Sequence, residues 1–318
     1  MIGRLVDNIR HTPRGARIRI LARSFSVQAV AGALLDAHRR GVHVQVVANG
    51  RASRQFKAVQ RMLPVIGTDR RKRSWLHLSP RWRPTAHQKI WTFSRTGDAR
   101  RVVMVGSANI SYRSLQQYSD MYTFVDRAEV WRTMDRVFRD RAGVDRDATR
   151  RLHVRLGRDE AWFFPGWRLG TDPVVRRLAA LPADGLRLRF AMYAWYGRRG
   201  DRIARVVAGK ARRGATVTVV ATTLGPRSRR ILERAGVRVL RGTLDNGDDV
   251  HAKLTLAAWT GRDGTRRRTV LTGSDNFGLP SLRRAEVLLA IDATRGPAWR
   301  DYVRWYDDIV ARIAAEAR

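Results

Sequence analysis

The sequence predicts an α/β protein built from two copies of one structural unit. Two motifs, His-x-Lys and Gly-Ser-x-Asn, occur once in each half of the chain, in the same order. The segments around them alternate between short runs of period two, typical of strands, and longer amphipathic runs typical of helices. With 318 residues, 44% of them hydrophobic, the chain is long enough and apolar enough to fold as two ordinary domains.

Each copy opens with a strand, a helix and a second strand. Residues 15–25 and 184–195 alternate apolar and polar side chains, as strands do. Residues 29–49 and 202–222 each indicate an amphipathic helix that ends at Arg-Arg-Gly and is followed by a strand.

The motifs follow in the next part of each copy. The first pair is His87 and Lys89, and the second is His251 and Lys253. Residues 94–101 and 260–268 are rich in Gly, Asp and Arg and predict hairpin turns. An apolar strand then leads into Gly-Ser-x-Asn in each copy, and residues 119–126 and 285–292 predict one further strand each.

The predicted first repeat covers residues 1–145 and the second covers residues 146–318. A link of about 143–170, rich in Arg, Gly and Asp, joins them, and residues 297–317 predict a closing helix with proline at its start. Residues 161–167 predict an edge strand stopped by Pro165. The equivalent segment of the first copy would lie before residue 1, so we expect the opening strand of the first repeat to be missing.

Composition narrows the classes of function. There are no cysteines, which excludes disulfides and thiolate metal sites, and no apolar run approaches the ~18 residues of a membrane-spanning helix. The first fifteen residues lack the apolar core of a signal peptide. The net charge of +35 favours polyanionic partners such as nucleic acid, an anionic membrane surface or phosphorylated substrates. A genome-wide preference for arginine codons is an alternative cause of the high arginine content.

Lysine is rare in this basic chain. Of 63 Lys and Arg residues, only Lys57, Lys72, Lys89, Lys210 and Lys253 are lysine. Two of the five belong to the His-x-Lys motifs. Because lysine is a compact point charge and arginine a broad planar fork, we expect these two positions to need an ammonium group.

The paired motifs predict a phosphodiester site. On a strand, residues i and i+2 point to the same face, so each histidine should project beside its lysine. Two such faces would bring two imidazoles and two ammonium groups together, with the asparagines as further donors. One imidazole can attack phosphorus while the other protonates the leaving oxygen, and the cations neutralise the phosphoryl oxygens. A single His-x-Lys is more often a solvated face, but two copies inside a longer repeat are far more specific.

These motifs resemble the signature of the phospholipase D superfamily, His-x-Lys-x4-Asp followed by Gly-Ser-x-Asn, and the resemblance covers nearly the whole chain. It implies two α/β/α sandwich halves related by a pseudo-twofold axis, with the active site at their interface. It also implies a covalent phosphohistidine intermediate and no cofactor or metal. The length and the Phe-Phe-Pro-Gly segment are similar to small secreted bacterial members, so we expect a secreted monomer.

The resemblance also implies roles for individual residues. His87 is expected to be the nucleophile and His251 the general acid. Phosphate binding is expected from Lys89, Lys253, Asn109 and Asn276, with supporting roles for Ser107 and Ser274.

The sequence departs from the signature at its aspartate. That residue would fall at positions 94 and 258, which hold Ser94 and Ala258. Other acids, Asp120 and Glu286, stand 14 and 13 residues past the motif glycines. An acid there can orient an imidazole and fix its tautomer, so we retain the enzyme interpretation.

Three interpretations of the substrate remain open. The first is a phospholipase D-like enzyme that cleaves or exchanges phospholipid headgroups, in peripheral contact with an anionic membrane. The second is a metal-independent endonuclease, favoured by the charge. The third is a weakly catalytic relative that binds polyanions, favoured by the missing aspartates.

Overall fold

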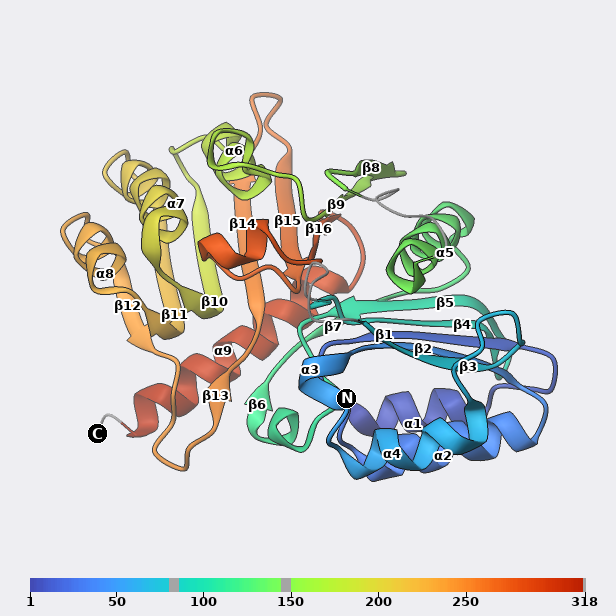
Figure 1. Ribbon diagram of the computed structural model, residues 1–318. Helices are drawn as coiled ribbons and strands as arrows, with labels where there is room; N and C mark the ends of the chain where they lie inside the picture. The colour runs from blue at the N-terminus through green and yellow to red at the C-terminus, as the bar shows by residue number, and fades with distance from the viewer. Residues whose placement is uncertain (80–85, 144–149, 317–318) are drawn as a thin grey trace. The chain divides into compact units, whose positions relative to one another are not determined.

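The computed structural model describes residues 1–79, 86–143 and 150–316 (Figure 1). The chain divides into two compact units. Unit 1 comprises Met1–Leu115, Asp120–Leu152 and Arg284–Glu286, and unit 2 comprises Gln116–Ser119, His153–Arg283 and Val287–Arg318. Within the described ranges, no helix is long and apolar enough to cross a membrane.

Unit 1 is built on a six-stranded mixed sheet. The strand order is β3-β2-β1-β4-β5-β7, in which β1, β2 and β3 are parallel and the others are antiparallel to their neighbours. The strands are β1 (Arg17–Ala22), β2 (His43–Asn49), β3 (Trp75–Ser79), β4 (Ile90–Thr96), β5 (Ala99–Gly106) and β7 (Met121–Phe124).

Helices cover both faces of this sheet. Figure 1 shows α1 (Ile2–Arg10), α2 (Gln28–Arg39) and α4 (Lys57–Ile66) on one face and α5 (Ala128–Ala142) on the other. The apolar stripe of α2, which includes Val30 and Leu34, packs into the same core as Ile18 and Ile20 of β1. Two short helices, α3 (Gly50–Ser53) and the 3-10 helix η1 (Tyr112–Gln116), connect these elements.

Unit 2 repeats this plan on a larger sheet. Its strand order is β12-β11-β10-β14-β15-β16-β9-β8. The first six strands match β3-β2-β1-β4-β5-β7 in order and direction, which confirms the prediction of an α/β fold built from two repeats. The strands are β8 (His153–Leu156), β9 (Asp159–Phe163), β10 (Arg187–Trp195), β11 (Thr216–Leu224), β12 (Arg238–Arg241), β14 (Lys253–Thr260), β15 (Arg266–Gly273) and β16 (Val287–Asp292).

The helices of unit 2 also form two layers. The apolar sides of α6 (Pro173–Ala180), α7 (Gly197–Ala211) and α8 (Pro226–Glu233) share one core with β10, β11 and β15. On the opposite face lies α9 (Ala298–Glu316), the predicted closing helix, where Tyr306 donates a hydrogen bond to the backbone oxygen of Thr218. The 3-10 helices η2 (Leu169–Thr171) and η3 (Leu279–Leu282) complete the unit.

One strand assignment was wrong. The segment around residues 161–167 was expected to form a sheet edge, but β9 lies between β16 and β8, and β8 forms the edge. The polar residues that suggested a link form a hairpin instead, which turns at Gly157 with a φ of 65°. The predicted domain boundary at residues 145 and 146 lies outside the described residues.

Each unit also contains a short segment from the other half of the sequence. In unit 2, β6 (Gln117–Tyr118) pairs in parallel with β13 (Asp249–Val250). In unit 1, Ala285 forms a parallel bridge with Ala86. The two exchanges involve corresponding places of the repeat, immediately before β7 and β16.

Candidate active site

The two His-x-Lys motifs lie at the start of corresponding strands. Both histidines precede their strands, since β4 begins at Ile90 and β14 at Lys253, so the expectation that both motif residues lie within a strand was wrong. Each lysine nevertheless meets its histidine. The distance from Nζ to Nδ1 is 3.2 Å for Lys89 and His87 and 3.3 Å for Lys253 and His251.

Each motif lysine is also held by the backbone of its motif. In each pair Nζ donates a hydrogen bond to the carbonyl oxygen of the histidine two residues earlier. Both ammonium groups are buried. A guanidinium is planar and longer, so it would not fit the same short loop between side chain and carbonyl.

The exchanged segments position the backbone of both histidines. The amide of His87 donates to the carbonyl of Ala285 at 3.0 Å, and the amide of His251 donates to the carbonyl of Tyr118 at 3.0 Å. Tyr118 and Ala285 therefore occupy equivalent positions, and each histidine is fixed by the half of the sequence that does not contain it.

Glu286 orients the ring of His87. Its Oε2 lies 2.8 Å from Nδ1 of His87, and the glutamate side chain is fully buried. A carboxylate accepts a hydrogen bond, so this contact places the proton of a neutral imidazole on Nδ1. Nε2 then carries the lone pair, as a nucleophile at phosphorus requires.

The environment of His251 is different. Its ring lies 4.5 Å from the ring of Tyr193, centroid to centroid, and Nζ of Lys253 lies 4.9 Å from the same tyrosine ring. The position equivalent to Glu286, one residue after the anchoring carbonyl, is held by Ser119. Asp120 and Glu286, which were predicted to have the same role, therefore do not occupy equivalent positions. Asp120 corresponds to Val287, one residue after Glu286.

The Gly-Ser turns bind the following strand in the same way in both units. The amide of Ser107 donates to the carbonyl of Asp120 and that of Ser274 to the carbonyl of Val287, both at 2.9 Å. In return, the Oγ of Ser107 accepts a hydrogen bond from the amide of Asp120 at 2.9 Å, and the Oγ of Ser274 accepts one from the amide of Val287 at 3.1 Å. The Oγ of Ser107 also donates to a carboxylate oxygen of Asp120 at 2.7 Å.

The motif glycines allow this close approach. A Cβ added at Gly106 would collide with the backbone oxygen of Asp120, and one added at Gly273 with that of Val287. Gly273 also adopts a φ of 140°, which favours glycine. The turn therefore requires glycine in both copies.

The motif asparagines carry polar atoms that the fold does not satisfy. Oδ1 of Asn109 and Oδ1 of Asn276 are both buried, and neither has a hydrogen-bond partner among the described residues. Buried polar atoms are normally paired, and unpaired ones are found at sites that bind a ligand or water. The same feature occurs in both copies.

A buried ion-pair network, which the sequence did not indicate, supports the second asparagine. Arg199 of α7 is fully buried and binds both Asp172, at 2.7 Å, and Asp275, at 2.6 Å. It also donates to the carbonyl of Asn276 at 2.7 Å. Burial alone would lower the pKa of Arg199, but Asp275 and Asp172 outweigh it and raise the pKa, so the network is charged.

The positions of the missing aspartates have structural roles. Ser94 Oγ accepts a hydrogen bond from the amide of Arg17 at 2.8 Å, which ties β4 to β1. Ala258 is buried on β14 and pairs with Arg187 of β10. No group of three His, Asp or Glu side chains gathers at metal-ligand distance in the part of the chain that the structure describes.

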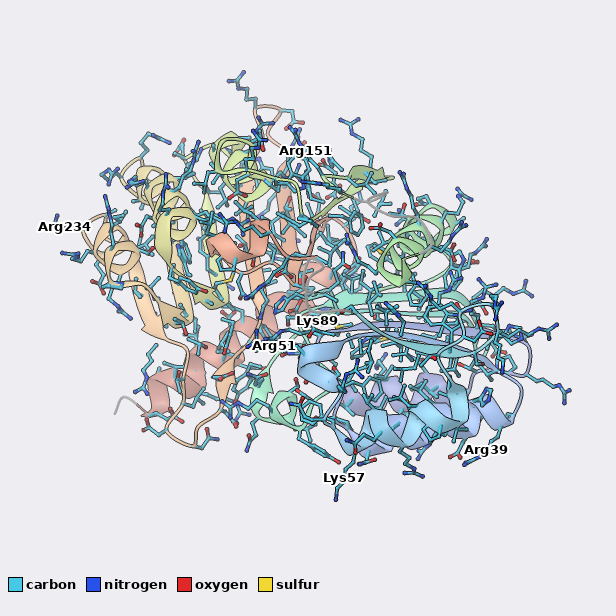
Figure 2. All side chains as sticks on the ribbon, in the orientation of Figure 1. Arg39, Arg51, Lys57, Lys89, Arg151 and Arg234 are labelled. Atoms are coloured by element: carbon cyan, nitrogen blue, oxygen red, sulfur yellow. The ribbon has the colours of Figure 1, made fainter. Side chains whose placement is uncertain are left out.

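A third lysine is also buried. Lys210 donates to the carbonyls of Ala179 and Leu181 at the end of α6, and burial, followed by the charge of Arg213, lowers its pKa. Two of the exposed arginines contrast with these lysines. Figure 2 shows Arg39 and Arg234 projecting to the outside of their own units, whereas Lys89 lies inside the fold.

Comparison with known proteins agrees with this geometry. A family model described as "Cardiolipin synthase, PLD-like domain" matches residues 5–142. No curated protein sequence matches the chain.

Two solved structures share the fold over nearly the whole chain. Phosphatidylserine synthase from Haemophilus influenzae Rd KW20 aligns with a TM-score of 0.68 at 13% identity, over 98% of this chain and 84% of that one. Polyphosphate kinase from Porphyromonas gingivalis aligns with a TM-score of 0.61 at 15% identity, over 95% of this chain and 47% of that one, so the chain spans about half the length of the kinase. The first repeat therefore matches a PLD-like domain over residues 5–142, and both repeats share the fold of these two structures.

Proposed function

We propose that the protein is a phosphodiesterase that cleaves or exchanges phospholipid headgroups through a phosphohistidine intermediate. The observation that carries the proposal is the buried contact between Glu286 and Nδ1 of His87. It fixes the tautomer in which Nε2 of His87 is a nucleophile.

The proposed reaction has two steps. Nε2 of His87 attacks phosphorus, the bond from phosphorus to the leaving oxygen breaks, and protonated His251 donates its proton to that oxygen. His251 then removes a proton from water or an alcohol, whose oxygen attacks phosphorus and releases His87. Water gives hydrolysis and an alcohol gives headgroup exchange.

The cations and amides of both motifs are assigned to the phosphoryl oxygens. Lys89 and Lys253 neutralise charge that grows as phosphorus becomes five-coordinate. The amides of Asn109 and Asn276 donate hydrogen bonds to the same oxygens. We assign supporting roles to Ser107, Ser274 and Asp120, which shape the two turns.

The lipid substrate is supported by two similarities. The family model is described as a cardiolipin synthase domain, and the fold matches a phosphatidylserine synthase over 98% of the chain. The basic surface also suits an anionic membrane, where each nearby cation adds about 1 kcal/mol of attraction.

An endonuclease is the second candidate, and the net charge of +35 favours it. Nucleic acid binding through many arginines would fall steeply with salt, with a log–log slope of roughly −0.9 per phosphate neutralised on duplex DNA. A weakly catalytic polyanion-binding protein is the third, because Ser94 and Ala258 replace the motif aspartates.

One experiment separates the three candidates. The purified protein is incubated in parallel with phosphatidylcholine vesicles and with plasmid DNA at low salt, and product is measured in both. We expect released headgroup and intact plasmid. Nicked plasmid without headgroup release would support the nuclease, and the absence of both products would support the binding role.

Two variants and one control test the assignment of the histidines. His87→Ala and His251→Ala should each abolish turnover while the far-UV circular dichroism stays unchanged. His11→Ala, an exposed histidine near α1, should retain full activity. Normal turnover by His87→Ala would refute the phosphohistidine mechanism.

A further inference from the structure

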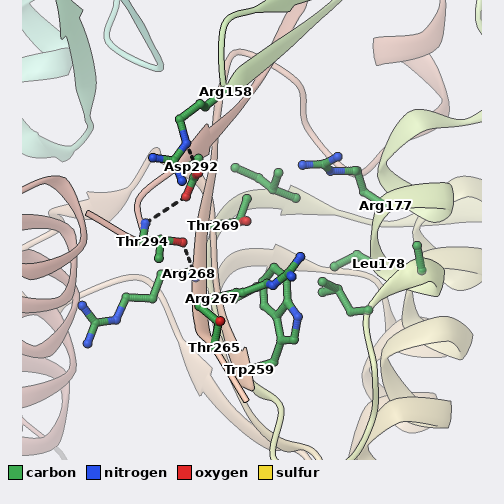
Figure 3. Close-up of a pocket in the computed structure, with 14 residues that line it drawn as sticks. Arg158, Arg177, Leu178, Trp259, Thr265, Arg267, Arg268, Thr269, Asp292 and Thr294 are labelled. Carbon is green, nitrogen blue, oxygen red and sulfur yellow. Dashed lines mark hydrogen bonds and ion pairs between the residues drawn. The ribbon is translucent and has the colours of Figure 1, made fainter. Parts of the chain in front are cut away.

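Unit 2 contains a cavity that no motif residue lines. It has a volume of about 550 Å³ and lies between α6 and one face of β14, β15 and β16 (Figure 3). That size is within the range of small-molecule binding sites.

Helix α6 covers only part of the length of the strands beneath it. A helix of 8 residues spans about 12 Å, whereas β14 and β15, with 8 residues each, span about 27 Å. The sheet therefore extends past Ala180, where the helix ends. The floor left open is formed by aligned pairs of the two strands, Ala257 with Thr269 and Trp259 with Arg267.

Unit 1 fills the equivalent space with large side chains. Two and four residues after the motif lysine, β4 carries Trp91 and Phe93, both fully buried in the core. The corresponding residues of β14 are Thr255 and Ala257, which are much smaller. The opening is therefore a difference in sequence between the two repeats and not a general property of the fold.

Part of the cavity lining is apolar, on the helix side and on the sheet side. Leu178 of α6 and Leu181, the residue after its end, face Ala257 and Leu271 of the sheet, and Trp259 also lines the cavity. This apolar part of the slot suits a hydrocarbon chain.

Guanidinium groups stand at the mouth of the slot. Figure 3 shows Arg177 reaching toward the sheet from α6 and Arg267 lying beside Trp259 on the opposite wall. The lining includes four arginines and one acid, Asp292. Arg268 points to the other face of the sheet, where it lies 5.8 Å from the ring of Trp299.

The ion pairs at the mouth do not block an anion. Arg267 binds Asp263 at 2.8 Å, and both side chains are about half exposed. Arg177 binds Glu160 at 2.5 Å at a partly exposed position. Exposed pairs of this kind contribute little to stability, so a ligand anion can share or replace the acid.

From these features we infer that the cavity binds an amphiphile with one anionic group and an unbranched hydrocarbon chain. The chain lies between Leu178 and Ala257, and the anionic group meets Arg267 and Arg177 at the mouth. Free fatty acids and lipids with a phosphate headgroup both present this chemistry. The inference does not depend on phosphodiester cleavage.

Titration calorimetry with the intact protein tests it, using alkyl carboxylates of 8, 10 and 12 carbons below their micelle concentrations. Affinity should rise about fourfold per added methylene until the slot is full. Dodecyl phosphate should bind in the same way as dodecanoate, and tighter binding of one of them identifies the preferred headgroup. A neutral dodecyl glycoside should bind at least about tenfold more weakly.

Variants locate the site. Ala257→Phe restores the residue of the first repeat and should lower dodecanoate affinity at least about tenfold by filling the slot. Thr269→Phe fills it from a partly exposed position and decides the question if Ala257→Phe does not fold. Arg267→Gln should weaken binding about tenfold, whereas Arg262→Gln, an exposed arginine of the same hairpin outside the cavity, should not change it.

Three results would overturn the inference. One is that dodecanoate does not bind the wild-type protein. Another is that both filling variants bind it unchanged. The third is that the neutral glycoside binds as tightly as dodecanoate.

Discussion

Replacing Arg199 with methionine removes the cation from the buried network that supports the second Gly-Ser-x-Asn turn. Arg199 has no exposed surface and bridges Asp172 and Asp275, which are also buried. Methionine preserves most of the volume but leaves two carboxylates without their partner. It also removes the hydrogen bond to the carbonyl of Asn276.

Breaking a buried ion pair by removing one partner costs about 3–5 kcal/mol. For a unit of this size, each kcal/mol shifts the melting temperature by about 2–4 °C, so the unfolding transition of unit 2 should fall by roughly 6–20 °C. The orphaned carboxylates should have raised pKa values in the folded state. The folded variant then binds more protons than the unfolded chain, so its deficit is largest near pH 7 and shrinks as the pH falls toward about 4.

Calorimetry and urea unfolding at pH 7 and pH 4.5 measure both effects. The matched control is Arg202→Met on the same helix, an exposed position where the change should stay within about 0.5 kcal/mol. An Arg199→Met protein as stable as this control, or one whose deficit does not depend on pH, would refute the reasoning. Phosphodiester turnover should fall as well, because Asn276 loses its anchor.

Further predictions concern the catalytic residues and the closing helix. Glu286→Gln should lower turnover by about 10²–10⁴-fold, without unfolding, because the amide no longer stabilises a charged ring at His87; steady-state kinetics with a thermal melt measures this, and unchanged turnover would remove Glu286 from the mechanism. Lys89→Arg should lose activity although it keeps the charge, and an active variant would show that any cation suffices. Turnover should persist in excess EDTA, and a loss reversed by a divalent ion would contradict the phosphohistidine route. Burial raises the pKa of Tyr306 well above its usual value, so the unfolded chain loses this proton first and stability falls by up to about 1.4 kcal/mol per pH unit above pH 10; Tyr306→Phe should lack that part of the loss in urea unfolding at pH 9 and pH 11, and equal slopes for both proteins would contradict it.

The repeat and its strands could be predicted because they depend on local periodicity. Strands such as β1 and β10 alternate over several residues, and the helix preceding each Arg-Arg-Gly has a clear apolar stripe. β8 was missed because it is short and polar, and β9 was placed at the edge because the partner that covers it is this missed strand. Local pattern does not show such partners.

The candidate site could be predicted only as a set of residue types. The pairing of each lysine with its histidine follows from a spacing of two residues. The contact between His87 and Glu286 joins positions 199 residues apart, and only the structure shows which of the two acids binds His87. Arg199 has no distinguishing neighbour in the sequence among so many arginines.

The exchanged segments determine how the protein can be dissected. A fragment ending at Leu152 contains His87 and Lys89 but lacks the carbonyl of Ala285 and the carboxylate of Glu286. The complementary fragment contains His251 but lacks Tyr118, whose carbonyl accepts from two of its amides. Although the fold repeats in two halves of the sequence, neither half contains a complete histidine environment, so neither half is expected to form its part of the site when expressed alone.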